Sequence, residues 1–306
     1  MTTPRVAIGP LASPFVTDAV VAGGGTVVEV GDRPDALVWL NPGDMAGLAE
    51  YLSVAPGARW VQLPFAGVEL VVEQGLLDHD RVWTCAKGSY AEPVAEHALT
   101  LTLAGLRHLP TRIFARSWGT PAGTSLYDQR VTILGGGGIT TRLLEQLAPF
   151  RVHSTVVRRS ADPVPGASRT VPVSALHDVL PGSLVVVLAL ALTAETQGII
   201  GAPELELMDP TAWLVNVARG RHVDTGALVT ALGAESIAGA ALDVTDPEPL
   251  PDGHPLWDLP NCIITPHTAD TIEMVMPLLA ERIRTNVARF ATGETLVGLV
   301  DADAGY

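Results

Sequence analysis

Basic residues are scarce in this sequence, and lysine is almost absent. The 306 residues include one lysine, Lys87, and 33 Asp and Glu against 19 Lys and Arg give a formal net charge of −14. Nucleic-acid binding needs clustered lysine and arginine, so the composition argues against a nucleic-acid partner. An anionic ligand would have to be held by arginines, by backbone amides or by the N-terminus of a helix.

Cysteines and long apolar runs are scarce as well. Cys85 and Cys262 lie far apart in apolar, strand-like settings, which predicts two buried free thiols, not a disulfide or a metal site, in a reducing cytoplasm. No stretch reaches about 18 consecutive apolar residues, the usual length of a membrane helix. The N-terminus also lacks a basic region followed by a long apolar run. We therefore expect a soluble cytoplasmic protein with no membrane association and no bound metal.

Apolar patterning dominates the rest of the sequence. With 47% hydrophobic and 17% charged residues, the chain can form sizeable cores, and its length suits two domains. In the first hundred residues, short apolar runs alternate with Gly, Pro and Asp, which predicts the strands of a small α/β unit. These runs lie at residues 6–8, 27–30, 36–40, 60–63 and 82–85.

A second series of strands follows a helix-like stretch at about residues 92–107 and a polar segment at 110–129. Its apolar runs lie at residues 131–134, 154–157, 184–188, 213–215 and 263–264. Strands separated by helix-length segments predict a parallel sheet that is covered on both faces. A last helix at about residues 271–290 is expected to pack back onto the N-terminal domain.

Three charged residues each follow an apolar, strand-like run: Arg219, Glu248 and His267. Open α/β sheets bind ligands at the ends of their strands, so these side chains are expected near one another. An arginine can grip a carboxylate, and a histidine backed by a carboxylate can move a proton near neutral pH. The set suits reduction of a 2-keto acid. Taken singly, each residue also has a structural interpretation, as an ion pair, a surface turn or a helix N-terminal histidine.

A glycine-rich loop, LGGGGIT at residues 134–140, lies between a predicted strand and a predicted helix. Gly135 and Gly137 match the first two glycines of a dinucleotide-binding fingerprint, and Gly138 and Ile139 follow at the start of the helix. The first glycine permits a tight turn, and the second has no Cβ to keep the backbone from a pyrophosphate. Thr140 replaces the usual third glycine or alanine, so helix and strand are expected to pack slightly farther apart. A plain turn before a helix is the alternative.

The end of the next strand indicates which dinucleotide binds. NAD-binding proteins carry an Asp or Glu about 20 residues past the glycines, which grips the ribose hydroxyls. Here the strand runs into Arg158, Arg159 and Ser160, and no carboxylate appears before Asp162. Two guanidinium groups and a hydroxyl suit the 2'-phosphate of NADP, so NADP(H) is favoured and NAD(H) stays possible. A solvated strand end is the alternative interpretation.

Several motifs, in order along nearly the whole chain, resemble those of the D-isomer-specific 2-hydroxyacid dehydrogenase family. They are the glycine loop, FAGV at 65–68, PVAEHAL at 93–99, LALTAET at 190–196, LVNVARG at 214–220, LDV at 242–244, EPL at 248–250, HPLW at 254–257 and TPH at 265–267. The resemblance implies an α/β protein of two Rossmann-like domains with doubly wound parallel sheets. The substrate domain would be discontinuous, formed by residues 1–98 and 273–306, and residues 99–272 would form the dinucleotide-binding domain. A homodimer joined through the dinucleotide-binding domains is also implied.

The resemblance assigns roles to the three charged residues. Arg219 would bind the substrate carboxylate and the keto oxygen. His267 would donate a proton to that oxygen while a hydride arrives from the nicotinamide. Glu248 would accept a hydrogen bond from the other ring nitrogen, which fixes the ring and raises the pKa of the histidine.

Further contacts are implied by the same resemblance. The backbone at Ala66 and Gly67 would close on the substrate carboxylate, and Asp243 would meet the nicotinamide carboxamide. Additional contacts with the cofactor would come from Leu190, Thr196, Val217, Ala218 and His267.

The expected substrate is a small 2-keto acid or 2-hydroxy acid. Glu248 argues against a formate dehydrogenase, in which the resemblance would place Gln, and the Arg158–Ser160 strand end resembles that of glyoxylate and hydroxypyruvate reductases. Because the chain ends about forty residues past His267, a phosphoglycerate dehydrogenase without the regulatory domain is one alternative. A dinucleotide-sensing binding protein with little turnover is another.

Overall fold

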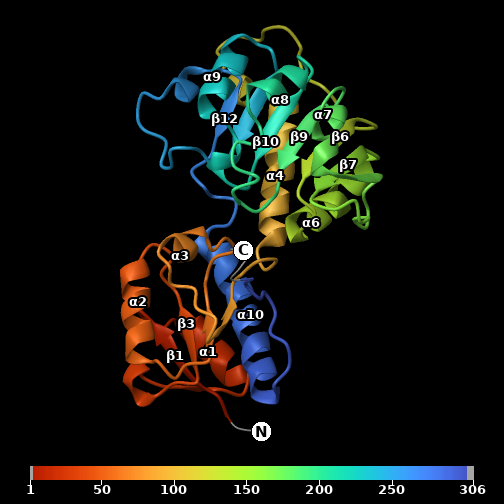
Figure 1. Ribbon diagram of the computed structural model, residues 1–306. Coiled ribbons are helices and arrows are strands. Elements are labelled where there is room, and N and C mark those ends of the chain that lie inside the picture. Colours follow the sequence, from red (N-terminus) through yellow and green to blue (C-terminus); the bar gives the residue numbers. More distant parts are fainter. Residues whose placement is uncertain (1–2, 302–306) are drawn as a thin grey trace. The chain divides into compact units, whose positions relative to one another are not determined.

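The computed structural model describes residues 3–301, and the described chain forms two compact units (Figure 1). The first unit contains the chain up to Tyr90 and again from Thr271, and the second contains Ala91–Asp270. Sequence placed the boundaries at 98/99 and 272/273. The first boundary falls earlier because helix α4 (Ala91–Leu106) is continuous and lies wholly in the second unit.

The first unit is a parallel five-stranded sheet with helices on both faces. Its strands follow the order β2-β1-β3-β4-β5. Its helices and strands are β1 (Arg5–Gly9), α1 (Pro14–Ala22), β2 (Thr26–Val27), β3 (Ala36–Trp39), α2 (Met45–Val54), β4 (Trp60–Gln62), α3 (Glu69–Glu73), β5 (Val82–Thr84) and α10 (Ile272–Thr292). The strand expected at 27–30 is shorter because β2 is an edge strand, and the chain turns at Val30–Asp32 after two paired residues.

The C-terminal helix α10 completes this unit, as the sequence predicted, by packing along α1 (Figure 1). The buried side chain of Asn286 ties it to strand β4 and to the segment that follows α10. Asn286 donates to the side chain of Gln62 (3.0 Å) and to the carbonyl of Val297 (2.9 Å). On the other face, Leu48 of α2 and Val71 of α3 pack into a buried apolar cluster. The unit is therefore built from both ends of the described chain.

The second unit is a parallel seven-stranded sheet in the order β12-β11-β10-β9-β6-β7-β8. Its helices and strands are α4 (Ala91–Leu106), α5 (Leu109–Ile113), β6 (Arg130–Leu134), α6 (Gly138–Leu147), β7 (His153–Arg158), β8 (Arg169–Pro172), α7 (Leu176–Val179), β9 (Val185–Leu188), α8 (Ala202–Leu207), β10 (Trp213–Asn216), α9 (Thr225–Gly233), β11 (Gly239–Leu242) and β12 (Cys262–Ile264). Two of these strands were not predicted from the sequence: β8, a short edge strand that begins with the polar residues Arg169 and Thr170, and β11, a short run of glycine, alanine and leucine.

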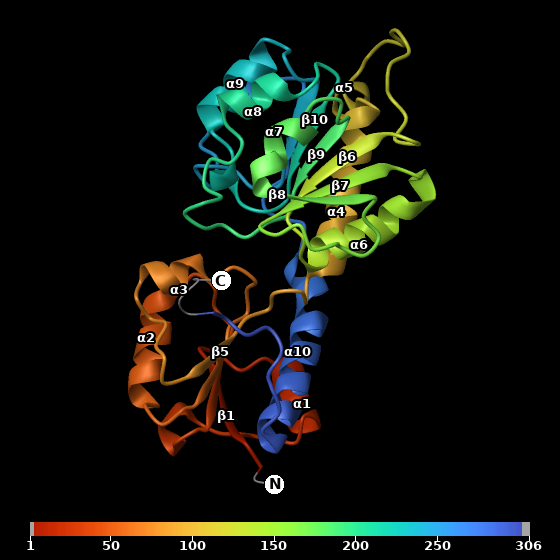
Figure 2. The same cartoon turned by 45° about the vertical axis from the view of Figure 1, so that its right-hand side comes forward.

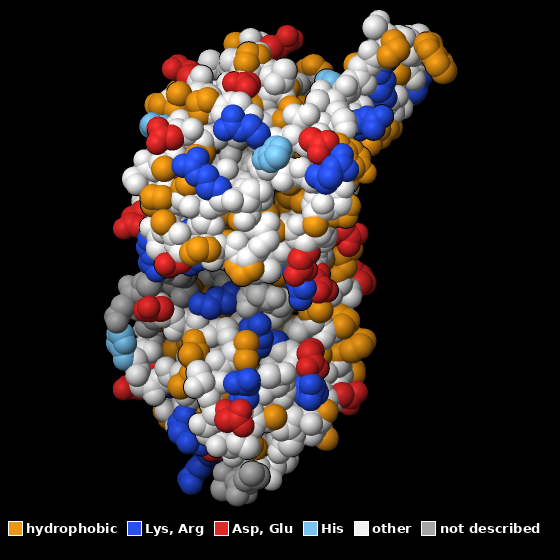
Figure 3. Space-filling model, turned by 90° about the vertical axis from the view of Figure 1, so that its right-hand side faces the viewer, with side chains coloured by type: hydrophobic (Ala, Val, Ile, Leu, Met, Phe, Trp, Pro, Cys, Tyr) orange, Lys and Arg blue, Asp and Glu red, His pale blue; other side chains and the backbone are white. Residues whose placement is uncertain are grey.

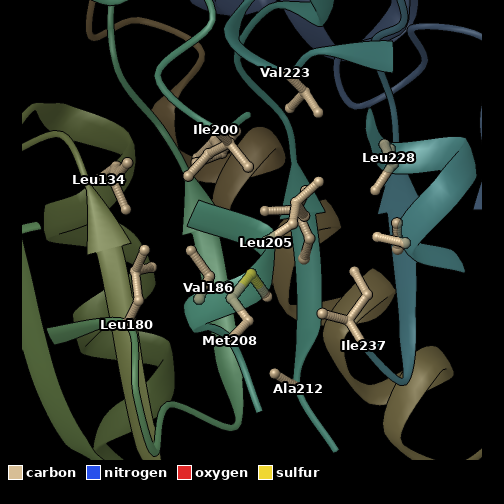
Figure 4. Packing of buried hydrophobic residues seen from close by; sticks show 14 of the residues in the cluster. Leu134, Leu180, Val186, Ile200, Leu205, Met208, Ala212, Val223, Leu228 and Ile237 are labelled. Carbon is tan, nitrogen blue, oxygen red and sulfur yellow. The ribbon is translucent and has the colours of Figure 1, made fainter. Parts of the chain in front are cut away.

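Helices cover both faces of this sheet (Figure 2). Helices α4 and α6 pack together on one face, while α7, α8 and α9 lie on the other. The apolar cluster beneath the second group includes Val186 of β9 and Leu205 of α8 (Figure 4). Because the central strands are buried on both faces, they consist of continuous apolar runs such as Val185–Leu188.

The predicted α/β fold class, two domains with doubly wound parallel sheets, is confirmed. In the second unit, the strand order reverses between β6 and β9, which is the position where such sheets bind ligands beyond their carboxyl ends. The loops that carry Arg219, Glu248 and His267 follow strands β10, β11 and β12 at this edge. Within residues 3–301, no helix is both long enough and apolar enough to cross a membrane.

The two cysteines are free thiols, as predicted. Cys85 is buried. Cys262 is only partly buried, in contrast to the expectation, because β12 is the edge strand of its sheet.

Candidate active site

Arg219 lies in the loop that follows β10, and the last residue of that strand shapes the loop. Asn216 is fully buried. Its side-chain oxygen accepts from the backbone N–H of Ala218 (3.0 Å), and its amide nitrogen donates to the carbonyl of Arg219 (2.8 Å). Arg219 is partly buried, and its guanidinium donates to the Ala218 carbonyl (2.7 Å). The Asn216 side chain therefore stabilises the turn formed by Asn-Val-Ala-Arg at the carboxyl end of β10.

The Arg219 loop packs tightly against the loop that carries Glu248. A Cβ at Gly220 would collide with the backbone carbonyl of Thr245. Glycine is needed here because only its missing side chain lets the two backbones come this close. Gly220 thus brings the segments after β10 and β11 together at one edge of the sheet.

Glu248 and His267 form a hydrogen-bonded pair. The Nδ1 atom of His267 lies 2.6 Å from Oε1 of Glu248, and both side chains are roughly half exposed. This hydrogen bond raises the pKa of His267, against a smaller opposing effect of burial, and it lowers the pKa of Glu248. With Nδ1 directed at the carboxylate, Nε2 is the ring nitrogen that can deliver a proton to a substrate.

The positive charge of Arg219 affects both members of this pair. It lowers the pKa of Glu248, and it opposes the rise in the pKa of His267. The three residues that the sequence singled out therefore share one electrostatic environment in the second unit. They combine a cation that can hold an anion with a histidine whose pKa is raised, so that it stays protonated at higher pH than usual.

The backbone of His267 has an unusual conformation, with φ of 50°. Left-handed backbone is uncommon for residues other than glycine and persists where the surroundings hold it. The N–H of His267 donates to the carbonyls of Asp243 (2.8 Å) and Thr265 (3.0 Å). The position of the imidazole thus depends on the strand ends of β11 and β12.

Asp243 is a buried carboxylate at the end of β11, and several donors surround it. It accepts hydrogen bonds from the hydroxyl of Thr265 (2.6 Å) and from the backbone N–H groups of Thr268 (2.9 Å) and Ala269 (3.1 Å). His97 approaches it as well, at 3.2 Å. Burial alone would raise the pKa of Asp243, but these hydrogen bonds lower it to about 2. Asp243 therefore stays ionised and binds the segment that follows His267.

Three neighbours of the site were missed as functional candidates: His97, Thr265 and Asp270. His97 and Thr265 stand inside the motifs PVAEHAL and TPH, so the signal was present in the sequence. No motif in the sequence indicated a role for Asp270. Burial raises the pKa of this carboxyl, while the nearby His267 acts to lower it.

The glycine loop leaves room for a pyrophosphate. Gly135 has φ of 107°, and a Cβ there would collide with the carbonyl of Ala189. A Cβ at Gly137 would meet nothing within 4 Å, and Gly137 and Gly138 are exposed where α6 begins. Thr140 is buried and donates to the Gly135 carbonyl (2.8 Å). Open space over exposed backbone amides at a helix N-terminus fits a dinucleotide phosphate.

The end of β7 holds both cationic and anionic groups. The hydroxyl of Ser160 donates to the Asp162 carboxylate (2.7 Å), and the guanidinium of Arg158 lies 3.5 Å from the Asp162 carbonyl. The Arg158 side chain also passes close to Gly136 of the glycine loop. Asp162 therefore folds back beside the residues that were expected to bind a 2'-phosphate, which the sequence spacing did not reveal.

Four further cofactor candidates lie in the loops after β9 and β10. Val217 and Ala218 are buried, Leu190 is partly buried, and the Thr196 hydroxyl donates to the carbonyl of Ala191 (2.8 Å). Ile139 is partly buried in the first turn of α6. In the described part of the chain, no three His, Cys, Asp or Glu side chains are grouped to hold a metal ion.

The substrate-binding candidates Ala66 and Gly67 belong to the first unit. They lie between β4 and α3, where Ala66 is exposed and Gly67 is partly buried. The carbonyl of Phe65 accepts from the N–H of Ala86 (2.8 Å), which ties this loop to the segment after β5.

Comparisons with known proteins agree with the chemistry of this site. Residues 98–269 match the model of the NAD-binding domain of D-isomer-specific 2-hydroxyacid dehydrogenases. The chain is 42% identical to an uncharacterized protein in the proB 3' region of Corynebacterium melassecola, over 95% of this chain and 96% of that protein. It is 34% identical to a glyoxylate reductase of Aeropyrum pernix, over 83% of this chain and 79% of the relative.

A solved structure shows the same fold over its full length. It is a D-isomer-specific 2-hydroxyacid dehydrogenase from Xanthobacter autotrophicus Py2 in complex with NADPH and MES. The TM-score is 0.86 at 26% identity, with 100% of both chains covered.

Proposed function

Because this chain belongs to the D-isomer-specific 2-hydroxyacid dehydrogenase family, we propose that it reduces a small 2-keto acid of the glyoxylate or hydroxypyruvate type. The family consists of oxidoreductases that act on the CH–OH group of 2-hydroxy acids with NAD or NADP. In the proposed reaction, the keto carbon gains a hydride and the keto oxygen gains a proton, which gives the 2-hydroxy acid and the oxidised dinucleotide.

The hydrogen-bonded pair of His267 and Glu248 beside Arg219 carries this proposal. Arg219 would bind the carboxylate and polarise the keto oxygen, since its planar fork can reach both. Nε2 of His267 would donate the proton to that oxygen. Glu248 would hold the ring in position and stabilise its protonated form. The backbone of Ala66 and Gly67 is proposed to contribute to binding of the substrate carboxylate.

A nicotinamide dinucleotide would supply the hydride when bound. Its pyrophosphate is proposed to lie on the exposed amides at the start of α6, where Gly137 leaves space. Contacts with the rest of the cofactor are assigned to the loops after β7, β9 and β10, and the nicotinamide carboxamide to Asp243. The NADPH found in the Xanthobacter autotrophicus structure supports this choice of cofactor class.

Spectrophotometric assays of cofactor consumption test the activity. We expect oxidation of NADPH in the presence of glyoxylate or hydroxypyruvate. Preference for phosphohydroxypyruvate would favour the phosphoglycerate dehydrogenase alternative. Tight dinucleotide binding without turnover of any 2-keto acid would refute the reductase and favour a dinucleotide-sensing protein.

The same assay measures which dinucleotide the protein prefers. We expect a KM for NADPH about tenfold below that for NADH, because hydrogen bonds to a charged phosphate contribute roughly 1.5–3 kcal/mol. Replacing Arg158 and Arg159 by Gln should abolish the preference. Arg169→Gln, an exposed change at the start of β8, is the matched control. A lower KM for NADH in the wild type would contradict the NADPH assignment.

We further propose a homodimer in which the segment after α4 lies at the interface. This segment, which includes α5, projects from the second unit (Figure 2). Hydrophobic side chains are exposed on the projection (Figure 3). Ile113, Phe114 and Trp118 are 67%, 74% and 95% exposed. Exposed apolar patches of this kind mark interaction surfaces. Sedimentation should give a dimer for the wild type and a monomer for Phe114→Asp with Trp118→Asp; a monomeric wild type would refute the proposal.

A cytoplasmic location is proposed as well, on the basis of the two free thiols. Cell fractionation that found the protein in an oxidising compartment would overturn it.

A further inference from the structure

His97 and Asp243 form a second histidine–carboxylate pair, next to the pair of His267 and Glu248. His97 lies on α4, which packs along β10 and β11 on one face of the sheet. Its Nε2 atom is 3.0 Å from the hydroxyl of Thr265 and 3.2 Å from Oδ1 of Asp243. The side chain of His97 is 18% exposed and that of Asp243 only 1%. None of the roles described above uses His97.

The donor and the acceptor of each hydrogen bond in this group follow from the chemistry of the carboxylate. A carboxylate can only accept, so the Thr265 hydroxyl must donate its hydrogen to Asp243, at 2.6 Å. That hydroxyl oxygen is then left to accept from Nε2–H of His97. His97 is thus a donor to Thr265 and to Asp243, and it orients the hydroxyl that binds the carboxylate.

Asp243 in turn organises the backbone around His267. Its carboxylate binds the N–H groups of Thr268 and Ala269, and its carbonyl accepts from the N–H of His267. These bonds flank a residue in left-handed conformation, which must be held from both sides. A buried carboxylate that loses a donor becomes less favourable and rearranges or gains a proton. Loss of His97 would therefore loosen the backbone of the segment that carries the proposed proton donor, His267.

We propose that His97 is a positioning residue, which holds His267 in place for proton transfer through Thr265 and Asp243. The inference deepens the proposed function and rests on it for its kinetic readout. This role requires a hydrogen-bond donor at the Nε2 position. It does not require a positive charge on the imidazole. Gln can place an amide N–H near that position, whereas Leu fills similar space without a donor.

Amide hydrogen exchange tests the structural step without any need for activity. In His97→Leu, exchange at Thr268 and Ala269 should accelerate about tenfold or more relative to the amides of β10, because the Asp243 carboxylate that binds them has lost a donor; exchange at His267, whose N–H binds the Asp243 carbonyl, should accelerate with them. His97→Gln should restore most of the protection. The control is His153→Leu, an exposed change at the amino end of β7, and it should leave these amides unchanged. Unchanged exchange in a folded His97→Leu protein would overturn the proposal.

A double-mutant cycle tests the link to chemistry. His97→Leu should lower kcat for keto acid reduction about tenfold, and His97→Gln should recover most of it. In a His267→Asn background, His97→Leu should have little further effect on kcat, because its route to the reaction has been removed. Independent, multiplicative losses would refute action through His267. If the wild type reduces no 2-keto acid, the proposed function fails, and the exchange measurement alone decides the role of His97.

Discussion

Replacing His267 by alanine is expected to lower kcat for 2-keto acid reduction by roughly 10² to 10⁴, the usual contribution of general acid catalysis. The imidazole is the proton donor of the proposed reaction, and its removal leaves the keto oxygen to take a proton from water. Binding of the dinucleotide at the glycine loop should persist, because that loop follows a different strand, β6. Steady-state kinetics together with a dinucleotide titration measure both quantities. Full activity of His267→Ala would show that the proton comes from elsewhere.

The pH dependence of reduction gives a companion test of the Glu248 pair. Reduction needs protonated His267, so its rate should fall as the pH rises through the pKa of this group. That pKa is raised, chiefly by the hydrogen bond to Glu248, so the wild type should stay active to higher pH than an ordinary histidine would allow. Glu248→Gln removes the carboxylate charge, and the alkaline limb of the profile should move to lower pH. If the alkaline limb of the Glu248→Gln profile stays at the wild-type pH, Glu248 does not raise the pKa of the proton donor.

Replacing Arg219 by glutamine is expected to reduce kcat/KM for the keto acid by about 10² to 10³ or more, the range for loss of one donor to a developing oxyanion. The effect should appear in KM, because the carboxylate loses its cation, and in kcat, because the keto oxygen is no longer polarised. Arg219→Lys should recover only part of the loss, since an ammonium keeps the charge but not the planar fork.

A matched control for Arg219 lies two residues farther along the chain. Arg221 is exposed and donates to the side chain of Gln197 (3.1 Å). Arg221→Gln should leave kcat/KM near the wild-type value. Equal losses in the Arg219 and Arg221 variants would indicate a general effect of removing positive charge, and not substrate binding by Arg219.

Much of this site could be predicted because its signals are local. An apolar run followed by a charged residue marks a strand end, and parallel sheets gather those ends at one edge. Arg219, Glu248 and His267 were found in this way, and the hydrogen bond between Glu248 and His267 matches the chemistry expected of them. The glycine spacing likewise located the turn between β6 and α6. Each of these inferences depends only on neighbours in the sequence.

Contacts between distant segments could not be read in the same way. His97 and Thr265 are 168 positions apart, and only the packing of α4 against the sheet brings them together. The first boundary between the units also differs from the expected one at 98/99, because α4 is one continuous helix from Ala91.

The sequence by itself determined the family, the fold class and the residue types of the site, since strand periodicity and motif order are properties of the chain. Tertiary structure alone decided how those residues are supported. It showed that Asp243 is buried among donors that hold the His267 segment, and that Asp162 returns beside Ser160. The physical reason is that burial and hydrogen bonding depend on groups that only folding brings within reach.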